Sequence, residues 1–387
     1  MNEWRAILSG TCATLVGIGL ARFAYTPLLP AIISAHWFSA SVAAYLGAAN
    51  LTGYLAGALL GRPLAARFPA PSLLRAMMLL ATASFFACAT PVSFAWFFLW
   101  RLLSGIAGGA LMVLAAPAVL PHVSHRRRGL ASGAIFAGVG LGIAASGTLV
   151  PLLLHHGLTA AWRGLGILSL LLTLLAWTGW PATVPPRTAP HGTHHHPRRP
   201  AIQLRALYVE YALNAAGLVP HMLFLVDFVA RGLDRGLATG ARYWVLFGLG
   251  AVIGPVLSGQ MADRIGFGPA LRLAFVVQAI AVLLPALNTS PVCLIVSSVI
   301  IGAFTPGVVP LALGRIHELL PHDTDALQGA WSMATTGFAL LQAAGAYGLT
   351  FVLAQTGGDY RLLFIIGSAI FVLTLGIDLA ARTASES

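Results

Sequence analysis

The sequence predicts an all-α membrane protein in which twelve transmembrane helices form two pseudo-symmetric six-helix bundles. Of its 387 residues, 58% are hydrophobic and only 9% are charged. A water-soluble domain of this length needs more polar side chains to cover its surface. Two further observations support the prediction: long apolar runs recur along the whole chain, and an internal repeat relates its two halves.

Each apolar run is long enough to cross the membrane as a helix, because a span needs about 20 mostly apolar residues for some 30 Å of hydrocarbon. The runs lack the short alternating pattern of a lipid-embedded barrel. In chain order, the expected spans are Ile7–Ile33, Ala43–Leu64, Leu73–Thr90, Phe94–Leu120, Leu130–Leu154, Leu165–Trp180, Tyr208–Phe228, Tyr243–Met261, Leu271–Leu287, Val292–Leu313, Ala326–Leu353 and Leu362–Ala380.

The basic residues predict the orientation. All 22 are arginines, and when alternate loops are assigned to alternate sides, fifteen fall on the side of the termini and five on the other. The positive-inside rule therefore places both termini in the cytoplasm of a multi-pass protein of the bacterial inner membrane. Because these arginines are scattered through short loops, the net charge of +11 does not indicate nucleic-acid binding.

The longest polar stretch divides the chain. Residues 181–203 are rich in proline and histidine and predict a cytoplasmic linker between bundles at residues 1–180 and 204–387. The four linker histidines, His191, His194, His195 and His196, have no cysteine or carboxylate beside them. We therefore expect a solvated loop without a metal site.

A shift of 197 positions relates the two halves. It carries Gly53 onto Gly250, Gly57 onto Gly254, Gly105 onto Gly302, Arg67 onto Arg264 and Arg75 onto Arg272. Six spans repeated in parallel are a transporter architecture, with a site between the halves.

One loop carries a specific family motif. GQMADRIGFG, residues 259–268, contains Gly259, Asp263, Arg264 and Gly266 at the spacing G-x-x-x-D-R-x-G. On this motif the chain resembles the major facilitator superfamily, which implies a secondary transporter that works by alternating access. The resemblance assigns these residues to a cytoplasmic gating loop, where the carboxylate and nearby arginines form a charge latch. The first-half copy, GRPLAARFPA, keeps Arg67 but has Ala66 in place of the aspartate.

Two other stretches extend the resemblance. RLLSGIAGG, residues 101–109, is similar to the family's Arg-x-x-x-Gly pattern, whose arginine is associated with proton coupling. The opening stretch GIGLARFAYTPLLP, residues 17–30, resembles the bacterial YbfB/YjiJ-like subgroup. The resemblance implies a class of protein and not a substrate.

Arg22 is the most informative residue of the first span. It lies about 22 Å into the span and therefore near the midplane, where an arginine costs roughly 2.5–3.5 kcal/mol on insertion scales. Tyr25 and Thr26 share its helical face. This polar stripe predicts a cavity-lining cation that binds an anionic substrate group or a titrating carboxylate. The alternative is a structural arginine held by backbone carbonyls near Pro27.

In the seventh span, Glu210, Asn214 and His221 lie on one helical face. The repeat places His221 at the depth of Arg22, so we expect both to line one central cavity. A carboxylate or an imidazole there can carry a transported proton. The alternatives are an interfacial Glu210 paired with Arg205 and a His221 satisfied in helix packing.

Each of the remaining candidate site residues has two interpretations. Arg101 lies only about 10 Å inside the fourth span, so proton coupling competes with snorkelling to the interface. Asn50 and Tyr54 in the second span, and Trp331 and Gln342 in the eleventh, suit either an amphipathic organic solute or helix packing.

The predicted function is secondary active transport of a small organic solute, with coupling to protons. Arg22 and Arg101, in a half without a carboxylate between Glu3 and Glu210, indicate an anionic solute; drug or metabolite efflux by antiport is the alternative. A membrane enzyme or sensor is a remote third class, because no Ser, His and Asp trio lies at one depth.

We expect no catalytic residue and no cofactor. A chain without lysine cannot form the phosphate loop G-x-x-x-x-G-K-[ST]. The expected partners are the solute, protons and the lipid bilayer, and the expected state is a monomer.

Overall fold

The structure, a computed structural model, describes residues 3–124, 128–181, 198–320 and 324–386. Within these ranges the secondary structure is helical, as predicted. The helices of the first half are α1 (Glu3–Thr14), α2 (Tyr25–Ser34), α3 (Ala40–Arg67), α4 (Ala70–Ala87), α5 (Phe94–Val119), α6 (Arg128–Leu154) and α7 (Leu158–Ala176). Those of the second half are α8 (Arg198–Gly217), α9 (Leu225–Asp227), α10 (Leu237–Ile265), α11 (Phe267–Leu287), α12 (Pro291–Leu319), α13 (Thr324–Gln355) and α14 (Tyr360–Glu386).

Twelve helical segments of the described chain are long and apolar enough to cross a membrane, which confirms the predicted number. The first combines α1 with α2, and the seventh combines α8 with α9. Several boundaries differ from the predicted ones. α8 begins at Arg198, inside the stretch expected to be linker, and α7 ends at Ala176. Residues 182–197, which include the four linker histidines, lie outside the described residues.

The internal repeat also relates the closest helix contacts. α3 packs on α5 and α10 packs on α12 through glycines. A Cβ added to Gly105 would lie 2.0 Å from the carbonyl oxygen of Asn50, and one added to Gly302 would lie 2.0 Å from that of Phe247. Asn50 and Phe247 are related by the same shift of 197 as the two glycines. Backbones can approach this closely only where a side chain is absent, so the predicted pseudo-symmetric bundles are confirmed at the level of packing.

The first and seventh spans are both interrupted near their middle. Leu15–Leu20 and Pro220–Phe224 form wide π-helical turns, and residues 21–24 form a further turn before α2 begins. Pro27 lies in the first turn of α2, where the missing N–H costs little. Such breaks expose backbone carbonyls inside the membrane and are tolerated where neighbouring side chains donate to them.

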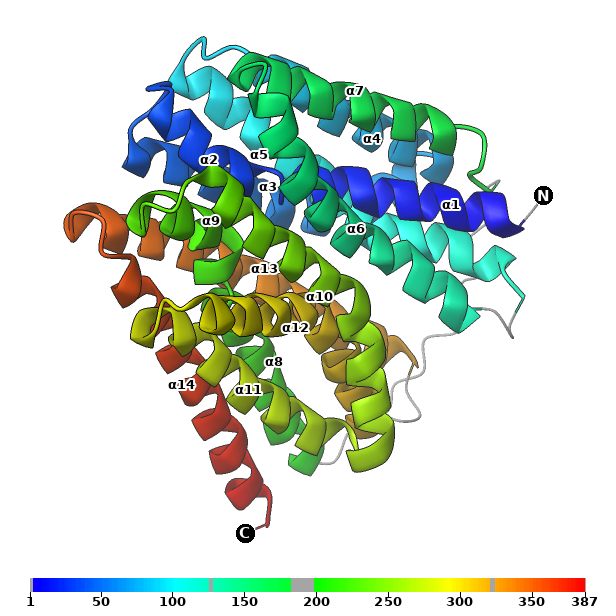
Figure 1. The fold of residues 1–387 in the computed structure, drawn as a ribbon. Helices are drawn as coiled ribbons and strands as arrows, with labels where there is room; N and C mark the ends of the chain where they lie inside the picture. Colours follow the sequence, from blue (N-terminus) through cyan, green and yellow to red (C-terminus); the bar gives the residue numbers. More distant parts are fainter. Residues whose placement is uncertain (1–2, 125–127, 182–197, 321–323, 387) are drawn as a thin grey trace.

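The two halves meet at the end far from the chain termini and diverge toward the termini (Figure 1). There α2 packs on α9, α6 on α10 and α3 on α13. A Cβ on Gly147 of α6 would lie 2.8 Å from a methyl of Val245, and the hydroxyls of Thr52 and Tyr347 lie 3.3 Å apart. We call this contact region the inter-half seam.

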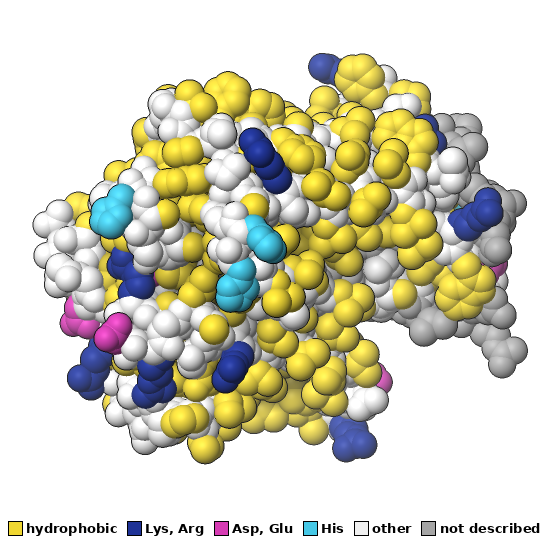
Figure 2. Space-filling model, turned by 45° about the horizontal axis from the view of Figure 1, so that its top comes forward, with side chains coloured by type: hydrophobic (Ala, Val, Ile, Leu, Met, Phe, Trp, Pro, Cys, Tyr) yellow, Lys and Arg dark blue, Asp and Glu magenta, His cyan; other side chains and the backbone are white. Residues whose placement is uncertain are grey.

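The outer surface is apolar. Figure 2 shows one face covered mostly by hydrophobic side chains with few charges. More than half of the surface of Leu171, Leu174 and Val372 is exposed. A helix hydrogen-bonds its own backbone, so it can lie in lipid with aliphatic side chains on its surface. The exposed aliphatic side chains on these long helices therefore match a lipid environment.

Candidate functional site

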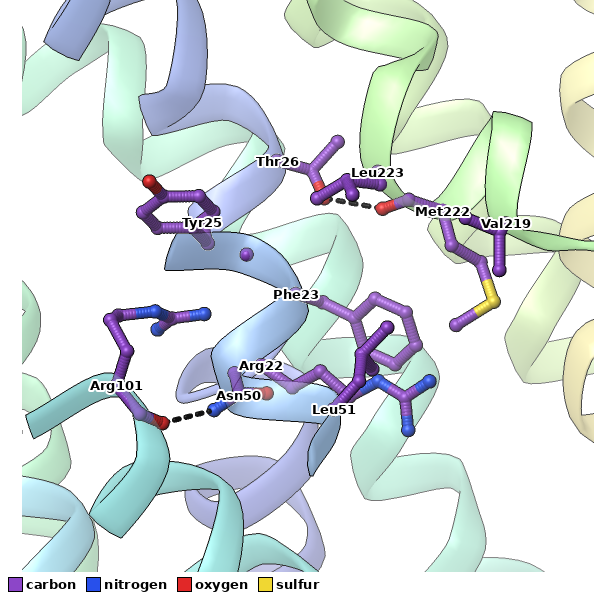
Figure 3. A pocket seen from close by; sticks show the side chains of 11 residues that line it. Arg22, Phe23, Tyr25, Thr26, Asn50, Leu51, Arg101, Val219, Met222 and Leu223 are labelled. Atoms are coloured by element: carbon purple, nitrogen blue, oxygen red, sulfur yellow. Dashed lines mark hydrogen bonds between the residues drawn. The ribbon is translucent and has the colours of Figure 1, made fainter. Parts of the chain in front are cut away.

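A pocket lies at the inter-half seam, beside the break in the first span. It holds about 340 Å³ of space not occupied by atoms, its open side included. The first half contributes Arg22, Thr26, Asn50 and Arg101 with apolar neighbours, and the second half contributes Val219, Met222 and Leu223 (Figure 3). The pocket therefore joins the two halves and contains two arginines and no carboxylate among its lining residues.

Arg22 lies in the turn between α1 and α2, and its guanidinium reaches the second half. One terminal nitrogen donates to the side-chain oxygen of Gln342 at 2.5 Å. The guanidinium carbon lies 5.0 Å from the ring centre of Phe23 and 4.9 Å from that of Tyr54. Its Nε is buried and has no hydrogen-bond partner among the described residues. Arg22 therefore keeps an unused donor beside the pocket.

Arg101 is bonded differently, although it lines the same pocket. It is 3% exposed, and its Nη1 donates to the Ala21 carbonyl oxygen at 2.9 Å. Its guanidinium carbon lies 4.3 Å from the ring centre of Tyr25, whose hydroxyl donates to the Ala43 carbonyl at 2.6 Å. In Figure 3 the guanidinium groups of Arg101 and Arg22 point to different sides of the turn. Arg101 and Tyr25 thus support the turn that presents Arg22.

Thr26 and Asn50 complete the polar lining. The Thr26 hydroxyl donates to the Met222 carbonyl oxygen at 2.6 Å and so closes the pocket across the seam. The Asn50 amide donates to the Arg101 carbonyl at 3.2 Å, while its side-chain oxygen is buried without a partner among the described residues.

The predicted stripe of the eleventh span faces the seam. Gln342 accepts from Arg22, and its amide nitrogen lies 3.5 Å from the sulfur of Met222. Trp331, nearer the start of α13, lies 5.8 Å from Tyr211 of α8 between ring centres. The structure therefore brings Arg22, Tyr54 and Gln342 together across the two halves.

His221 and Asn214 lie elsewhere, contrary to the expected shared cavity with Arg22. His221 is fully buried, with Nε2 at 2.7 Å from the Ser297 hydroxyl and its ring 5.1 Å from that of Phe364. The side-chain oxygen of Asn214 accepts from Gln278 at 3.2 Å. Both side chains point into the second bundle, because helical periodicity groups residues on a face without fixing which neighbour that face meets.

Glu210 belongs to a charge cluster at the termini end of the second half. Its carboxylate is 3% exposed and has no hydrogen bond to a described residue. It interacts electrostatically with Asp378, Arg315 and Arg272. Arg272 pairs with Asp378 at 2.9 Å. The alternative partner, Arg205, is exposed and is not among these interactions.

The predicted gating loop lies at the end of α10. Gly266 ends α10 with a φ of 82°, which favours glycine. Asp263, Arg264 and Arg67 are exposed, and within the described ranges Asp263 forms no hydrogen bond or ion pair. Among the described residues, the predicted latch across the termini side is therefore not formed in this structure.

The sequence interpretation missed one ion pair. Asp227 binds Arg231 at 2.8 Å and accepts a hydrogen bond from the Tyr360 hydroxyl. Asp227 is only 1% exposed. The spacing of four residues between Asp227 and Arg231 was the available signal.

Comparison with known proteins agrees with the fold. An uncharacterized transporter, YgaY of Escherichia coli O157:H7, is 32% identical over 170 residues, but the match covers only 43% of this chain and 42% of that protein. The aspyridones efflux protein apdF of Emericella nidulans is 26% identical over 303 residues, or 74% of this chain and 58% of that protein.

Solved transporters have the same fold. A D-xylose-proton symporter superposes with a TM-score of 0.72 at 14% identity, over 96% of this chain and 97% of that one. The xylose transporter XylE from E. coli, in a partially occluded inward open conformation, gives 0.73 at 13% identity over 96% of both chains. The sequence model of one transporter family matches residues 14–379. The chain therefore belongs to the major facilitator superfamily, in the family described as uncharacterised MFS-type transporter YbfB.

Proposed function

We propose that the protein transports a small organic anion across the bacterial inner membrane by alternating access coupled to protons. The observation that supports this most is Arg22, a membrane-embedded cation at the seam with one neutral partner and an unused donor. Ionisable groups at this depth usually face a water-filled path or a partner. A transported carboxylate, phosphate or sulfonate supplies the missing anion.

The lining favours an anion over a cation. No carboxylate lines the pocket, and the first 209 residues contain no acid other than Glu3. An anion that displaces the Gln342 oxygen gains charge-assisted hydrogen bonds, each contributing roughly 1.5–3 kcal/mol. Gln342 then turns its amide to the solute, so both halves contact the same molecule.

The arrangement of the seam supports alternating access. The halves touch only at the end far from the termini in the contacts described above, and the gating loop is unlatched. With the termini in the cytoplasm, this conformation opens to the cytoplasm. Rocking the halves would break the Thr26 to Met222 hydrogen bond and bring Asp263 toward the first half.

Glu210 is the proposed proton carrier. Its carboxylate is buried without a hydrogen bond to any described residue, near two arginines and a second carboxylate. Gain of a proton removes its attraction to Arg272 and Arg315 and so changes the charge balance of the cluster. His221, sealed against Ser297, is the weaker candidate.

Transport into proteoliposomes tests the proposal. Purified wild type is given radiolabelled benzoate or succinate with an imposed proton gradient, and Arg22→Gln and Arg22→Lys are compared with it. We expect Arg22→Gln to weaken affinity about tenfold or more and Arg22→Lys to retain part of it. Arg163→Gln, an exposed arginine of the other side, is the matched control. Unchanged affinity in Arg22→Gln would contradict the anion site.

Efflux is the second candidate direction, favoured by the similarity to a protein named as an aspyridones efflux protein. The same liposomes decide it. A gradient that is acidic outside drives accumulation in a symporter, whereas an antiporter expels preloaded anion under that gradient.

A further inference from the structure

Four aromatic side chains surround the approach to Arg22 from the termini side. Tyr54 comes from α3, Tyr211 from α8, and Trp331 and Phe338 from α13. We call these four residues the aromatic row. They come from both halves of the molecule and follow one another toward the end where the halves diverge.

Distances place the row beside the arginine. The ring centre of Tyr54 lies 4.9 Å from the Arg22 guanidinium carbon. Tyr211 lies 4.7 Å from Phe338 and 5.8 Å from Trp331 between ring centres, with interplanar angles of 38° and 36°. Phe338 is one helical turn from Gln342, the residue that holds Arg22. The row therefore begins beside the guanidinium of Arg22 and continues along α8 and α13.

The row has two hydroxyl groups that can bind a ligand. The hydroxyls of Tyr54 and Tyr211 form no hydrogen bond with any residue that the structure describes, although Tyr211 is only 4% exposed. The nearby Thr335 hydroxyl already donates to the Trp331 carbonyl at 2.8 Å. The buried Nε of Arg22 has no partner among the described residues, so an arginine donor and two phenols are available to a ligand with acceptor atoms.

We propose that the transported solute is an aromatic carboxylate, with its carboxylate on Arg22 and its ring against Tyr54 and Phe338. This inference rests on the proposed function and narrows it to one class of anion. Aromatic pairs gain energy from ring geometry beyond the area they bury. An aromatic amine is disfavoured, because Arg22 repels it and no carboxylate lines the pocket.

Binding of four probes to the purified full-length protein tests the class. Benzoate has both the charge and the ring, cyclohexanecarboxylate has the charge and a saturated ring, acetate has only the charge, and benzamide has the ring without the charge. We expect isothermal titration to show benzoate binding roughly three- to tenfold tighter than cyclohexanecarboxylate. Acetate should bind more weakly than both, and benzamide should show no binding.

Substitutions in the aromatic row test whether these residues cause the preference for benzoate over cyclohexanecarboxylate. Phe338→Leu and Tyr211→Leu should bring benzoate and cyclohexanecarboxylate to within about twofold of each other, while cyclohexanecarboxylate keeps its wild-type affinity. Phe351→Leu, an exposed phenylalanine on the same helix, should keep the preference. A thermal melt of each variant shows whether it is folded, and Tyr54→Leu, which removes the ring beside Arg22, replaces any variant that is not.

The outcomes separate the two proposals. Equal binding of benzoate and cyclohexanecarboxylate, with both lost in Arg22→Gln, overturns the aromatic class and leaves the anion transporter standing. Benzoate binding that survives Arg22→Gln overturns the anion site itself. Absence of binding by all four probes to folded wild type overturns the aromatic inference.

Discussion

Gly248 offers the sharpest test of alternating access, because it lies at the seam on α10. A Cβ added there would lie 2.4 Å from the backbone nitrogen and 2.8 Å from the Cα of Ala144 on α6, in the opposite half. Gly250, two residues further along α10, faces α12 of its own half, and its Cβ would lie 2.3 Å from the Val299 carbonyl oxygen. Alanine at the two positions therefore perturbs two different contacts.

The geometry sets the size of the effect. A Cβ contact is ordinarily 3.4 Å or more, so Gly248→Ala forces the helices of the seam apart by about 1 Å. Overpacking of this kind costs roughly 1–3 kcal/mol. The cost applies only while the seam is closed, so the ratio of the two conformations should move about five- to 150-fold away from this structure. Gly250→Ala clashes in both conformations and should lower stability without moving that ratio.

Distances between spin labels measure the ratio. Labels at Ala66 and Gln260, exposed near the termini ends of α3 and α10, report the gap that the halves leave there. The native cysteines Cys12, Cys88 and Cys293 are replaced first. We expect Gly248→Ala to shift the distribution to shorter distances and Gly250→Ala to keep the wild-type distribution. A folded Gly248→Ala with the wild-type distribution, or an equal shift in Gly250→Ala, would refute the reasoning.

Three further substitutions have defined outcomes. Asp227→Asn removes the charge that binds Arg231 and Tyr360 and should lower the free energy of unfolding by about 2–3 kcal/mol. The control Asp234→Asn, at an exposed position, should change the free energy of unfolding by less than about 0.5 kcal/mol. Equal thermal melts of the two variants would contradict this prediction. Glu210→Gln removes an unpaired buried carboxylate, so the melting temperature should not fall while proton-driven uptake is lost; uptake with an unchanged pH profile would exclude Glu210 as the carrier. Asp263→Asn should leave the thermal melt unchanged, because Asp263 is exposed and has no partner among the described residues. It should shift the spin-label distances toward longer values, because the proposed latch forms only when the halves close on the termini side; unaltered distances would argue against a latch.

Hydropathy and the internal repeat together predicted the fold, because both can be read directly from the sequence. A membrane span must be long and apolar wherever it packs, and the glycines that the shift of 197 relates lie at equivalent contacts between α3 and α5 and between α10 and α12. Span ends were less accurate. α10 begins at Leu237, six residues before the expected start, because helices continue into the polar interface beyond the hydrocarbon.

The sequence did not show which neighbouring helices each helix face contacts. Glu210, Asn214 and His221 share a face as predicted, but that face meets the interior of the second bundle, where Asn214 contacts Gln278 and His221 contacts Ser297. The break in the first span also lies before Pro27, at residues 15–24. It coincides with close approaches such as Gly19 to Gly142, where a Cβ would lie 2.7 Å from the partner's Cα. These contacts depend on the assembled bundle and not on the local sequence.

The two arginines of the first bundle show why a buried charge alone does not identify a site. Both lie in a half whose only acid is Glu3, and hydropathy assigns them the same cost. Arg101 meets the Ala21 carbonyl that the turn at residues 21–24 exposes, so its charge is compensated by the backbone. Arg22 comes from that same turn and points the other way, toward Gln342 of the opposite half. The break in the helix therefore has two effects. It exposes the carbonyl that satisfies the guanidinium of Arg101, and it directs the guanidinium of Arg22 away from the turn, where it is incompletely satisfied. Function should follow the second, because only an incompletely satisfied charge can gain free energy from a passing anion.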